Sequence, residues 1–341
     1  MIFKGIEICC PLCKGDLKEV GDRQKELRCE SCNRQYPVIL EIPDLRIFPD
    51  PYIDMESDRA KGLRVAERFN DLDFSGLVDF YYSMTSVVPP QHARQYKRGL
   101  MAGVARAKAA LAAWESQSGA YHQILPASLL EIGCGTAPLL VAAAPRFTRL
   151  VGVDIAFRWL VVGKKRLSEA GLDIPLICAC AEALPFSDAV FDRVAGDSMI
   201  ENVRDQTQTL KEAYRVLKPG GRLFLTTPNR FSLGPDPHTG LWAGGFLPRR
   251  WTNAYVRRQG GIPPQRNLLS LWALSQLLNK TGFRRHHIFL PYVPEGQRIH
   301  FPVWMNRWID LYHVARQLPV SRHLLYVLGP LFYAVCEKEE R

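Results

Sequence analysis

The chain has 341 residues, of which 47% are apolar and 23% charged, a composition typical of a globular protein with room for one large domain and one small one. Its longest apolar stretch, residues 324–336, is interrupted by Gly329 and Pro330 and is shorter than the roughly 20 residues that a membrane-spanning helix needs. The first residues also lack the apolar core of a secretory signal, so we expect a cytoplasmic protein without spanning helices.

The first predicted domain, residues 1–48, contains two Cys-x-x-Cys pairs between short β-like segments. The cysteines are Cys10, Cys13, Cys29 and Cys32. In a reducing compartment this spacing indicates a structural zinc site, because two tight turns aim four thiolates at one ion and leave no open coordination position. The zinc would therefore hold the fold rather than take part in chemistry.

This N-terminal domain resembles the zinc ribbon of the small activator subunit that partners tRNA and protein methyltransferases. The similarity extends to the tail "RQYPVILEIPDL". The present ribbon departs from that family because it is fused to a longer chain.

Two further parts follow the ribbon. Residues 49–127 carry the helical pattern "RGLMAGVARAKAALAAWESQ" and are predicted to form a helical linker or cap. Residues 128–341 begin with short β-branched runs that alternate with helical patterns up to about residue 229. Strands alternating with helices of this length predict an α/β fold of Rossmann-like type, with helices on both faces of a parallel sheet.

The segment "LLEIGCGTAPLL" places Gly133 and Gly135 after a predicted strand and at the start of a helix. Glycines at this position let the backbone approach a ligand, and the N–H groups of the helix start are expected to face it. A dinucleotide fingerprint would require glycine where Pro138 stands, and the acid Glu131 precedes the loop. The next strand ends in Asp154, where a carboxylate accepts the hydroxyls of a ribose. The pattern therefore argues for a nucleoside cofactor and against NAD.

With the segments that follow, the chain resembles the class I S-adenosylmethionine-dependent methyltransferases of the ubiquinone/menaquinone-biosynthesis type. The matching residues are Glu131, Gly133, Gly135, Asp154, Ala181, Glu182, Leu184, Pro185, Phe186, Phe191, Asp192, Glu201, Leu217, Lys218, Pro219, Gly220 and Gly221. The resemblance implies the class I methyltransferase sheet and S-adenosylmethionine as cofactor. The cofactor-binding residues that it implies are Glu131, Gly133, Gly135, Asp154, Ile155, Ala181, Glu182 and Asp197. Among them, Asp154 would hold the ribose, the Ala181 backbone would lie near the adenine, and Asp197 would flank the methionine end.

Three positions depart from the family's pattern. Ala137 replaces the third loop glycine, Cys180 replaces an acid that reaches the adenine amine, and Asn202 replaces a histidine that serves some relatives as a base. Any base must therefore come from elsewhere in the chain. A non-catalytic scaffold that binds the cofactor is the alternative that Cys180 and Asn202 leave open.

The segments after the fifth predicted strand are expected to cover the acceptor. We predict a lid over residues 230–262 and a helical insertion over residues 291–331. In the lid, Asp236 and His238 are interpreted as a catalytic pair in which the carboxylate orients an imidazole general base, with a turn-capping histidine as the alternative. His286 and His287, on a predicted strand, are interpreted as structural.

The charge of the chain is concentrated in its C-terminal part. Residues 245–330 contain 12 Lys and Arg but only Glu295 and Asp310 as acids, and five of the seven tryptophans lie in or just before this segment. A basic, aromatic surface attracts anionic lipid headgroups, pyrophosphate-linked substrates or nucleic acid. A solvated arginine-rich face and packing of the insertion over the acceptor are the alternatives.

Together these features predict a methyltransferase that O-methylates a small molecule, glycan or lipid-linked sugar, with peripheral membrane contact through the basic, aromatic C-terminal part. A tRNA or rRNA methyltransferase is the alternative that the ribbon and the basic segment suggest. Nucleic acid is the less favoured partner, because the fourth strand is followed by "GDSMIENV" and not by an Asn-Pro-Pro-Tyr-like tetrapeptide. The sequence leaves the acceptor and the oligomeric state open.

Overall fold

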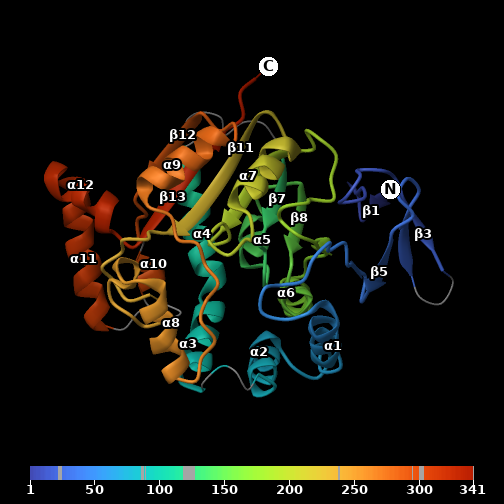
Figure 1. The fold of residues 1–341 in the computed structure, drawn as a ribbon, viewed down its shortest axis with the longest axis horizontal. Helices are drawn as coiled ribbons and strands as arrows, with labels where there is room; N and C mark the ends of the chain where they lie inside the picture. Colours follow the sequence, from blue (N-terminus) through green and yellow to red (C-terminus); the bar gives the residue numbers. More distant parts are fainter. Residues whose placement is uncertain are drawn as a thin grey trace.

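The computed structural model describes residues 1–21, 25–85, 88, 90–117, 127–236, 239–293, 295–298 and 303–340. A seven-stranded sheet forms the centre of the molecule (Figure 1). In spatial order its strands are β12 (Arg285–Phe289), β13 (Leu331–Glu337), β11 (Leu217–Pro228), β10 (Phe191–Asp197), β7 (Ser128–Ile132), β8 (Arg149–Asp154) and β9 (Leu176–Cys178). Strands β7 to β11 pair in parallel, whereas β13 runs antiparallel to both β11 and β12. The strand order reverses beside β7, and a crevice at the carboxyl ends of the strands is expected there.

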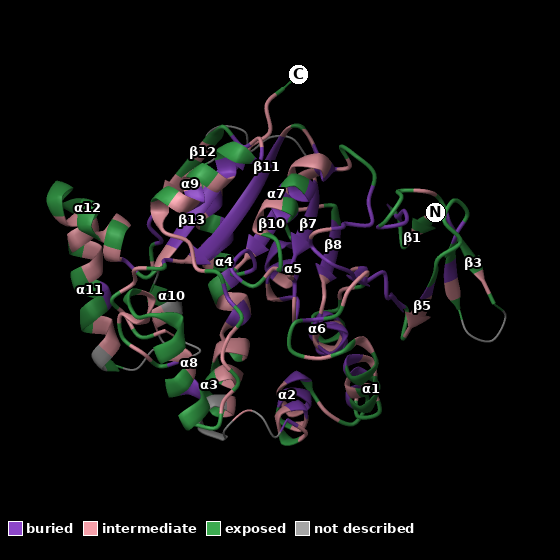
Figure 2. Ribbon diagram, viewed as in Figure 1, coloured by how far each residue is buried: buried purple, intermediate pink, exposed green. Residues whose placement is uncertain are grey.

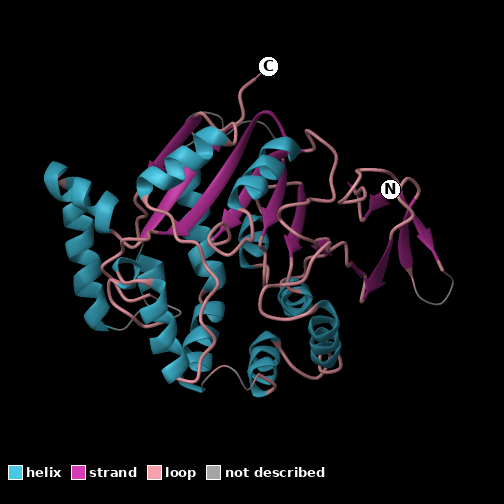
Figure 3. Ribbon diagram, in the orientation of Figure 1, coloured by secondary structure: helices cyan, strands magenta, loops and turns pink. Residues whose placement is uncertain are grey.

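Helices cover both faces of this sheet (Figure 3). On one face lie α4 (Gly103–Gln117), α5 (Pro138–Ala143) and α6 (Phe157–Glu169), and on the other lie α7 (Gln206–Val216) and α9 (Leu271–Lys280). Neighbouring residues of β7 serve the two layers, since Leu129 packs with the first set and Leu130 with the second. Trp114 of α4 stacks on Phe224 of β11, with ring centroids 5.0 Å apart. The predicted Rossmann-like α/β fold is confirmed.

The N-terminal ribbon consists of a short hairpin and a four-stranded antiparallel sheet. Its strands are β1 (Ile2–Phe3), β2 (Ile6–Glu7), β3 (Leu17–Val20), β4 (Glu26–Cys29), β5 (Gln35–Ile39) and β6 (Ile42–Pro43). The ribbon lies beyond the β9 edge of the large sheet (Figure 1). Ile6 and Leu17 belong to the same apolar core as Leu184 and Phe186, so the two parts share a buried interface.

Helices α1 (Met55–Ala66), α2 (Phe74–Ser83) and α3 (Pro90–Met101) follow the ribbon. The side chains of Asp54 and Asp73 cap α1 and α2 by accepting the N–H groups of Ser57 and Gly76. Both helices pack against α6. They thereby cover α6, the helix that follows β8.

The C-terminal part adds short helices around the sheet. The predicted lid contains η2 (Gly244–Phe246) and α8 (Arg249–Arg258), and the predicted insertion contains α10 (Glu295–Arg298), α11 (Val303–Gln317) and α12 (Pro319–Leu328). Helices α11 and α12 pack on each other and project at one side of the molecule, and much of their surface is exposed (Figure 2). Among the described residues, no helix combines the length and apolarity that crossing a membrane requires.

Candidate zinc and cofactor sites

Two turns in the ribbon repeat one backbone pattern. In the first, the Lys14 N–H donates to the Cys10 carbonyl at 2.9 Å, and in the second, the Asn33 N–H donates to the Cys29 carbonyl at 3.0 Å. Lys14 and Asn33 each have a φ of 59°, a left-handed conformation that ends the turn directly after its second cysteine. Each turn thus brings the two sulfurs of one pair close together.

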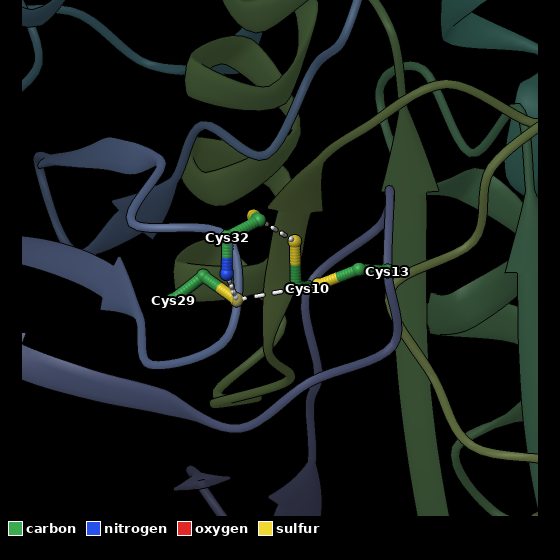
Figure 4. Close-up of side chains that lie close together, drawn as sticks. All are labelled: Cys10, Cys13, Cys29 and Cys32. Carbon is green, nitrogen blue, oxygen red and sulfur yellow. Dashed lines mark hydrogen bonds between the residues drawn. The ribbon is translucent and has the colours of Figure 1, made fainter.

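The four cysteines predicted as ligands meet between these turns (Figure 4). All four sulfur atoms lie within 4.8 Å of one another. The Sγ atoms of Cys10 and Cys32 are 3.7 Å apart, and those of Cys13 and Cys29 are 3.4 Å apart. Four cysteine sulfurs in one cluster form the ligand set of a structural zinc site.

The four sulfurs differ in their environment, since the pKa of Cys13 and that of Cys32 are raised while that of Cys10 is lowered. Burial disfavours the Cys10 thiolate, but the Tyr36 hydroxyl at 3.3 Å and backbone N–H groups lower the pKa of Cys10 to about 7. Burial instead raises the pKa of the neighbouring Cys9, which therefore keeps its proton. The donor set fits Zn²⁺, with Cys9 outside it.

The loop between β7 and α5 begins with Gly133, which has a φ of +74°. A Cβ atom there would lie 2.7 Å from Cγ of Met199, so only glycine lets these two segments approach. The N–H groups of Gly133 and Cys134 donate to the Val153 carbonyl at 2.7 and 3.0 Å. β8 therefore already binds these two N–H groups, which are not free for a ligand. The loop offers a bare backbone surface instead.

Asp154 ends β8 next to this loop. Its carboxylate accepts the N–H of Gly135 at Oδ2 and the N–H of Ala156 at Oδ1, both at 2.8 Å. Burial raises the pKa of Asp154 to about 6, although these two donors oppose the shift. Each carboxylate oxygen has two lone pairs, so Asp154 keeps acceptor capacity for a ligand.

A cleft of about 710 Å³ opens at the carboxyl ends of β7, β8, β9 and β10. This volume lies within the range of about 300–1,000 Å³ that is usual for small-molecule sites. Five of the predicted cofactor-binding residues line it, namely Gly133, Asp154, Ile155, Ala181 and Glu182. The Glu182 carboxylate also accepts the N–H groups of Arg204 and Asp205, at 2.8 and 3.0 Å, and so fixes the loop beside the cleft.

The other three predicted residues lie behind this lining. Gly135 donates its N–H to the Asp154 carboxylate and so helps to hold that side chain in place. Glu131 is buried within β7, and burial together with the nearby Asp197 and Asp154 raises its pKa well above the ordinary value. Its Oε2 atom has no hydrogen-bond partner among the described residues. Asp197 accepts the hydroxyl of Thr226 at the end of β10.

Sequence reasoning missed part of the cleft wall. Residues 48–51, which connect the ribbon to α1, line the cleft, as do Arg204, Gln265 and Asn267. Arg249, one of the basic residues of the C-terminal part, lines it too. No periodicity or spacing marks residues 48–51, and the only local signal is the mixture of proline, aspartate and phenylalanine directly after the ribbon.

Of the predicted catalytic pair, the structure describes Asp236 only. His238 lies outside the described residues. The Asp236 carboxylate accepts the Arg266 guanidinium at 2.5 Å and the Thr239 N–H at 3.0 Å. Asp236 thus joins the lid to residue 266, next to the cleft-lining Gln265 and Asn267.

The segment that forms this cleft is similar to a known protein family. Residues 130–225 match the family described as Methyltransferase domain. This segment is a methyltransferase domain. It contains the loop at Gly133, the carboxylate of Asp154, and Ser198 and Met199, which follow β10 and line the cleft.

Two relatives are similar to the methyltransferase domain. A mitochondrial 2-methoxy-6-polyprenyl-1,4-benzoquinol methylase from Leishmania donovani is 39% identical over 105 residues, which are 30% of this chain and 36% of that protein. A ubiquinone/menaquinone biosynthesis C-methyltransferase from Marinomonas sp. is 40% identical over 106 residues, covering 28% of this chain and 41% of that protein. The chain thus spans less than half the length of these curated relatives. A SAM-dependent methyltransferase from Thermotoga maritima, of solved structure, is 19% identical, with a TM-score of 0.43, over 72% of this chain and 95% of that one.

The cleft fits S-adenosylmethionine, the cofactor of such domains. Asp154 offers a carboxylate for ribose hydroxyls, and Ile155 and Ala181 offer apolar surface for an adenine. At Gly133 the missing side chain leaves the backbone open to the cleft, as a closely held ligand requires.

Proposed function

We propose that this protein is a methyltransferase that uses S-adenosylmethionine to methylate a small acceptor molecule. The observation that carries the proposal is the cleft at the strand-order reversal, lined by Gly133 and Asp154 within a methyltransferase domain. Ligands of open α/β sheets bind at this position.

The bound cofactor supplies a methyl group on a sulfonium, and the protein's contribution is alignment in a dry pocket. Asp154 holds the nucleoside by its ribose. Met199, packed against Gly133, forms an apolar wall at the end of β10. Excluding water there favours in-line transfer to the acceptor over side reactions.

The acceptor we propose is a glycan, a lipid-linked sugar or another small molecule, methylated on oxygen. Arg204 and Arg249 line the cleft and suit an acceptor with an anionic part. Methylation of a ring carbon is the second candidate, because the relatives named above act on polyprenyl benzoquinol and in quinone biosynthesis, the latter by C-methylation. RNA is less favoured, because the end of β10 and the loop after it read "GDSMIENV" and contain no Asn-Pro-Pro-Tyr-like tetrapeptide.

We propose His238 as the general base for a hydroxyl acceptor, with Asp236 anchoring the lid that carries it. Support comes from the position of Asp236, whose partner Arg266 lies between two cleft-lining residues. Glu201 is another candidate base, since burial raises its pKa to about 7. Its carboxylate is buried, however, and accepts the Thr227 hydroxyl at 3.1 Å.

We also propose that the hairpin of α11 and α12 contacts an anionic membrane surface. Exposed apolar side chains follow both helices, at positions Trp308, Leu311, Val314, Leu318, Val320, Leu324 and Val327. Exposed apolar residues beside arginines such as Arg307 and Arg322 are typical of helices that lie in a membrane interface. Asp310 is neutralised by Arg298 at 2.6 Å. This contact would bring a lipid-linked acceptor to the enzyme.

Labelled methyl transfer tests the proposed function. The full chain is incubated with methyl-labelled S-adenosylmethionine and, separately, with a lipid extract, a glycan extract and bulk RNA, with Asp154→Asn as the control variant. We expect label in the lipid or glycan fraction, and mass spectrometry of the product then separates O- from C-methylation. Label confined to RNA would exclude the small-molecule acceptor, and failure of the chain to bind the cofactor in calorimetry would exclude the proposed function altogether.

A further inference from the structure

The segment that joins the ribbon to α1, residues 44–52, runs along the β9 edge and reaches the cleft; we call it the strap. Asp44 forms a parallel bridge with Cys178, and the Leu45 N–H donates to the Cys178 carbonyl at 2.7 Å. Further on, the Cys180 thiol donates to the Phe48 carbonyl at 3.6 Å. The strap thus extends the sheet by a short piece and then turns across the ends of its strands.

A buried arginine fixes the first half of the strap. Arg46 has a fully buried side chain and binds two carboxylates, Asp44 at 2.6 Å and Asp58 of α1 at 2.7 Å. It also donates to the carbonyl of Ile155 at 3.1 Å. Ile155 follows Asp154 and lines the cleft, so Arg46 ties the strap directly to the cofactor site. Removing one partner of such a buried pair strongly destabilises the folded chain, because a buried charge is left without a partner.

A second arginine fixes the other half. Arg158, in the first turn of α6, binds Asp58 at 2.6 Å and Asp50 of the strap at 3.2 Å. Asp58 therefore bridges the two arginines, and it also accepts the N–H of Phe157 at 2.9 Å. The other oxygen of Asp50 accepts the Tyr52 N–H at 2.8 Å. Asp50 is held in one orientation by contacts to both of its oxygens.

Residues 48–51 of the strap line the cleft on the side of β8 and β9. The Arg204 guanidinium, which also lines the cleft, lies over the Phe48 ring, 5.2 Å from the ring centroid. Asp50 presents a nearly buried carboxylate to the same cleft, and its two contacts leave lone pairs unused. Because Asp154 marks the position of the ribose, this side of the cleft receives the adenosine half of the cofactor and not the methionine half.

We propose that residues 48–51 of the strap are part of the cofactor site, with Asp50 accepting a hydrogen bond from the adenosine half and Phe48 forming the apolar wall beside it. This inference rests on the proposed function, since it requires S-adenosylmethionine in the cleft. It assigns cofactor binding to a segment that lies outside residues 130–225 and is held by the ribbon, α1 and α6 together.

The test compares two charge-neutral variants of the same network, Asp50→Asn and Asp44→Asn, in the full chain. Both remove one carboxylate charge from a buried arginine, but only Asp50 lines the cleft. Binding of S-adenosylhomocysteine is measured by calorimetry, and folding by the melting temperature. We expect Asp50→Asn to weaken binding at least tenfold. Asp44→Asn should lower the melting temperature at least as much as Asp50→Asn does, but it should change the dissociation constant less than threefold.

A second ligand, 5′-methylthioadenosine, locates the contact. Asp50→Asn should weaken its binding by the same factor, because this ligand keeps the adenosine half and lacks the amino-acid half. If Asp50→Asn does not fold, Asp50→Glu keeps the charge for Arg158 but displaces the carboxylate, and it should weaken both ligands in the same way.

Three results would overturn the inference. They are unchanged binding by the Asp50 variants, equal losses in the Asp50 and Asp44 variants, and a loss for S-adenosylhomocysteine without one for methylthioadenosine. In each case the wild-type chain still binds the cofactor product and the proposed function stands. Absence of binding by the wild-type chain would overturn both.

Discussion

Asp154 shows how one residue can organise a site while remaining available to a ligand. Its two oxygens hold the Gly135 loop and the start of α6 through N–H donors at 2.8 Å. Burial nevertheless raises its pKa to about 6, and the nearby Asp50 adds to this shift while Arg158 opposes it. The carboxylate therefore changes its protonation state within an experimentally accessible range of pH.

Cofactor affinity should consequently depend on pH. Ribose hydroxyls donate to the ionised carboxylate, so S-adenosylhomocysteine should bind more tightly as the pH rises through about 6, and about tenfold more weakly at pH 5 than at pH 8. Titration calorimetry between pH 5 and 8 measures this. Asp154→Asn should bind weakly with a flat profile, whereas the exposed Asp173→Asn should keep the wild-type slope. A flat profile in the wild-type chain would contradict the assignment of Asp154.

The effect of Asp154 on stability has the opposite sign. Its pKa in the folded chain without cofactor lies above the ordinary value of 3.8, so folding favours the protonated form. This contribution to stability is fully present below pH 3.8 and is lost as the pH rises through about 6.

At the scale of elements, the α11–α12 hairpin differs from the helices that cover the sheet. Whereas α4 to α7 bury apolar residues against strands, α11 and α12 keep many of theirs exposed, and only Ile309 among the large ones described on these helices is buried. The hairpin is attached to the rest of the chain by Tyr312 and Arg316, which donate to the carbonyls of Pro291 and Leu290, and by Tyr326, which packs against the main core. Exposed apolar side chains that gather on one surface mark a site of contact with a protein or a membrane.

Vesicle binding should therefore depend on this hairpin. Leu324→Glu places a charge in the exposed stripe of α12 and should weaken binding to anionic phosphatidylserine vesicles about tenfold, since burying one leucine is worth about 1.5–3 kcal/mol. Sedimentation with vesicles measures it, and Leu63→Glu, on an exposed position of α1, is the matched control. Equal binding by all three proteins, or no binding by the wild-type chain, would refute the membrane contact.

At the scale of the whole molecule, the ribbon and the methyltransferase domain are continuous in their cores. The Lys14 ammonium, beside a zinc-ligand turn, binds the Leu184 carbonyl at 2.9 Å and the Glu212 carboxylate of α7 at 3.2 Å. The Cys9 N–H donates to the Pro185 carbonyl at 2.9 Å. Structural zinc supplies folding free energy directly, so a loss of zinc should reach the domain through these contacts.

We therefore expect the chain to unfold in one calorimetric transition whose midpoint falls by at least about 5 °C when zinc is removed. Cys29→Ser should have the same effect as a chelator and should also weaken S-adenosylhomocysteine binding, because the strap begins where the ribbon ends. Cys9→Ser, next to the cluster but outside it, should retain zinc and the wild-type midpoint. Two separate transitions, with the second unaffected by chelation, would show that the ribbon is an independent unit.

The sequence by itself determined the features whose signals are local. Four cysteines at fixed spacing indicated the metal cluster, alternating strands and helices indicated the sheet, and Gly133 and Asp154 could be placed at strand ends, because a strand or a turn depends on residues close together in the chain. The predicted residues that line the cleft all follow strands whose ends converge in a parallel sheet.

Only the tertiary structure decided what distant segments do to one another. It showed that β8 binds the N–H groups of Gly133 and Cys134, that Glu131 lies behind the cleft, and that residues 48–51 form part of its wall. Asp50 and Arg158 are 108 residues apart, and no periodicity records such a pairing. Their contact exists because the ribbon packs on the edge of the sheet, and packing of this kind depends on the complementary surfaces of complete elements.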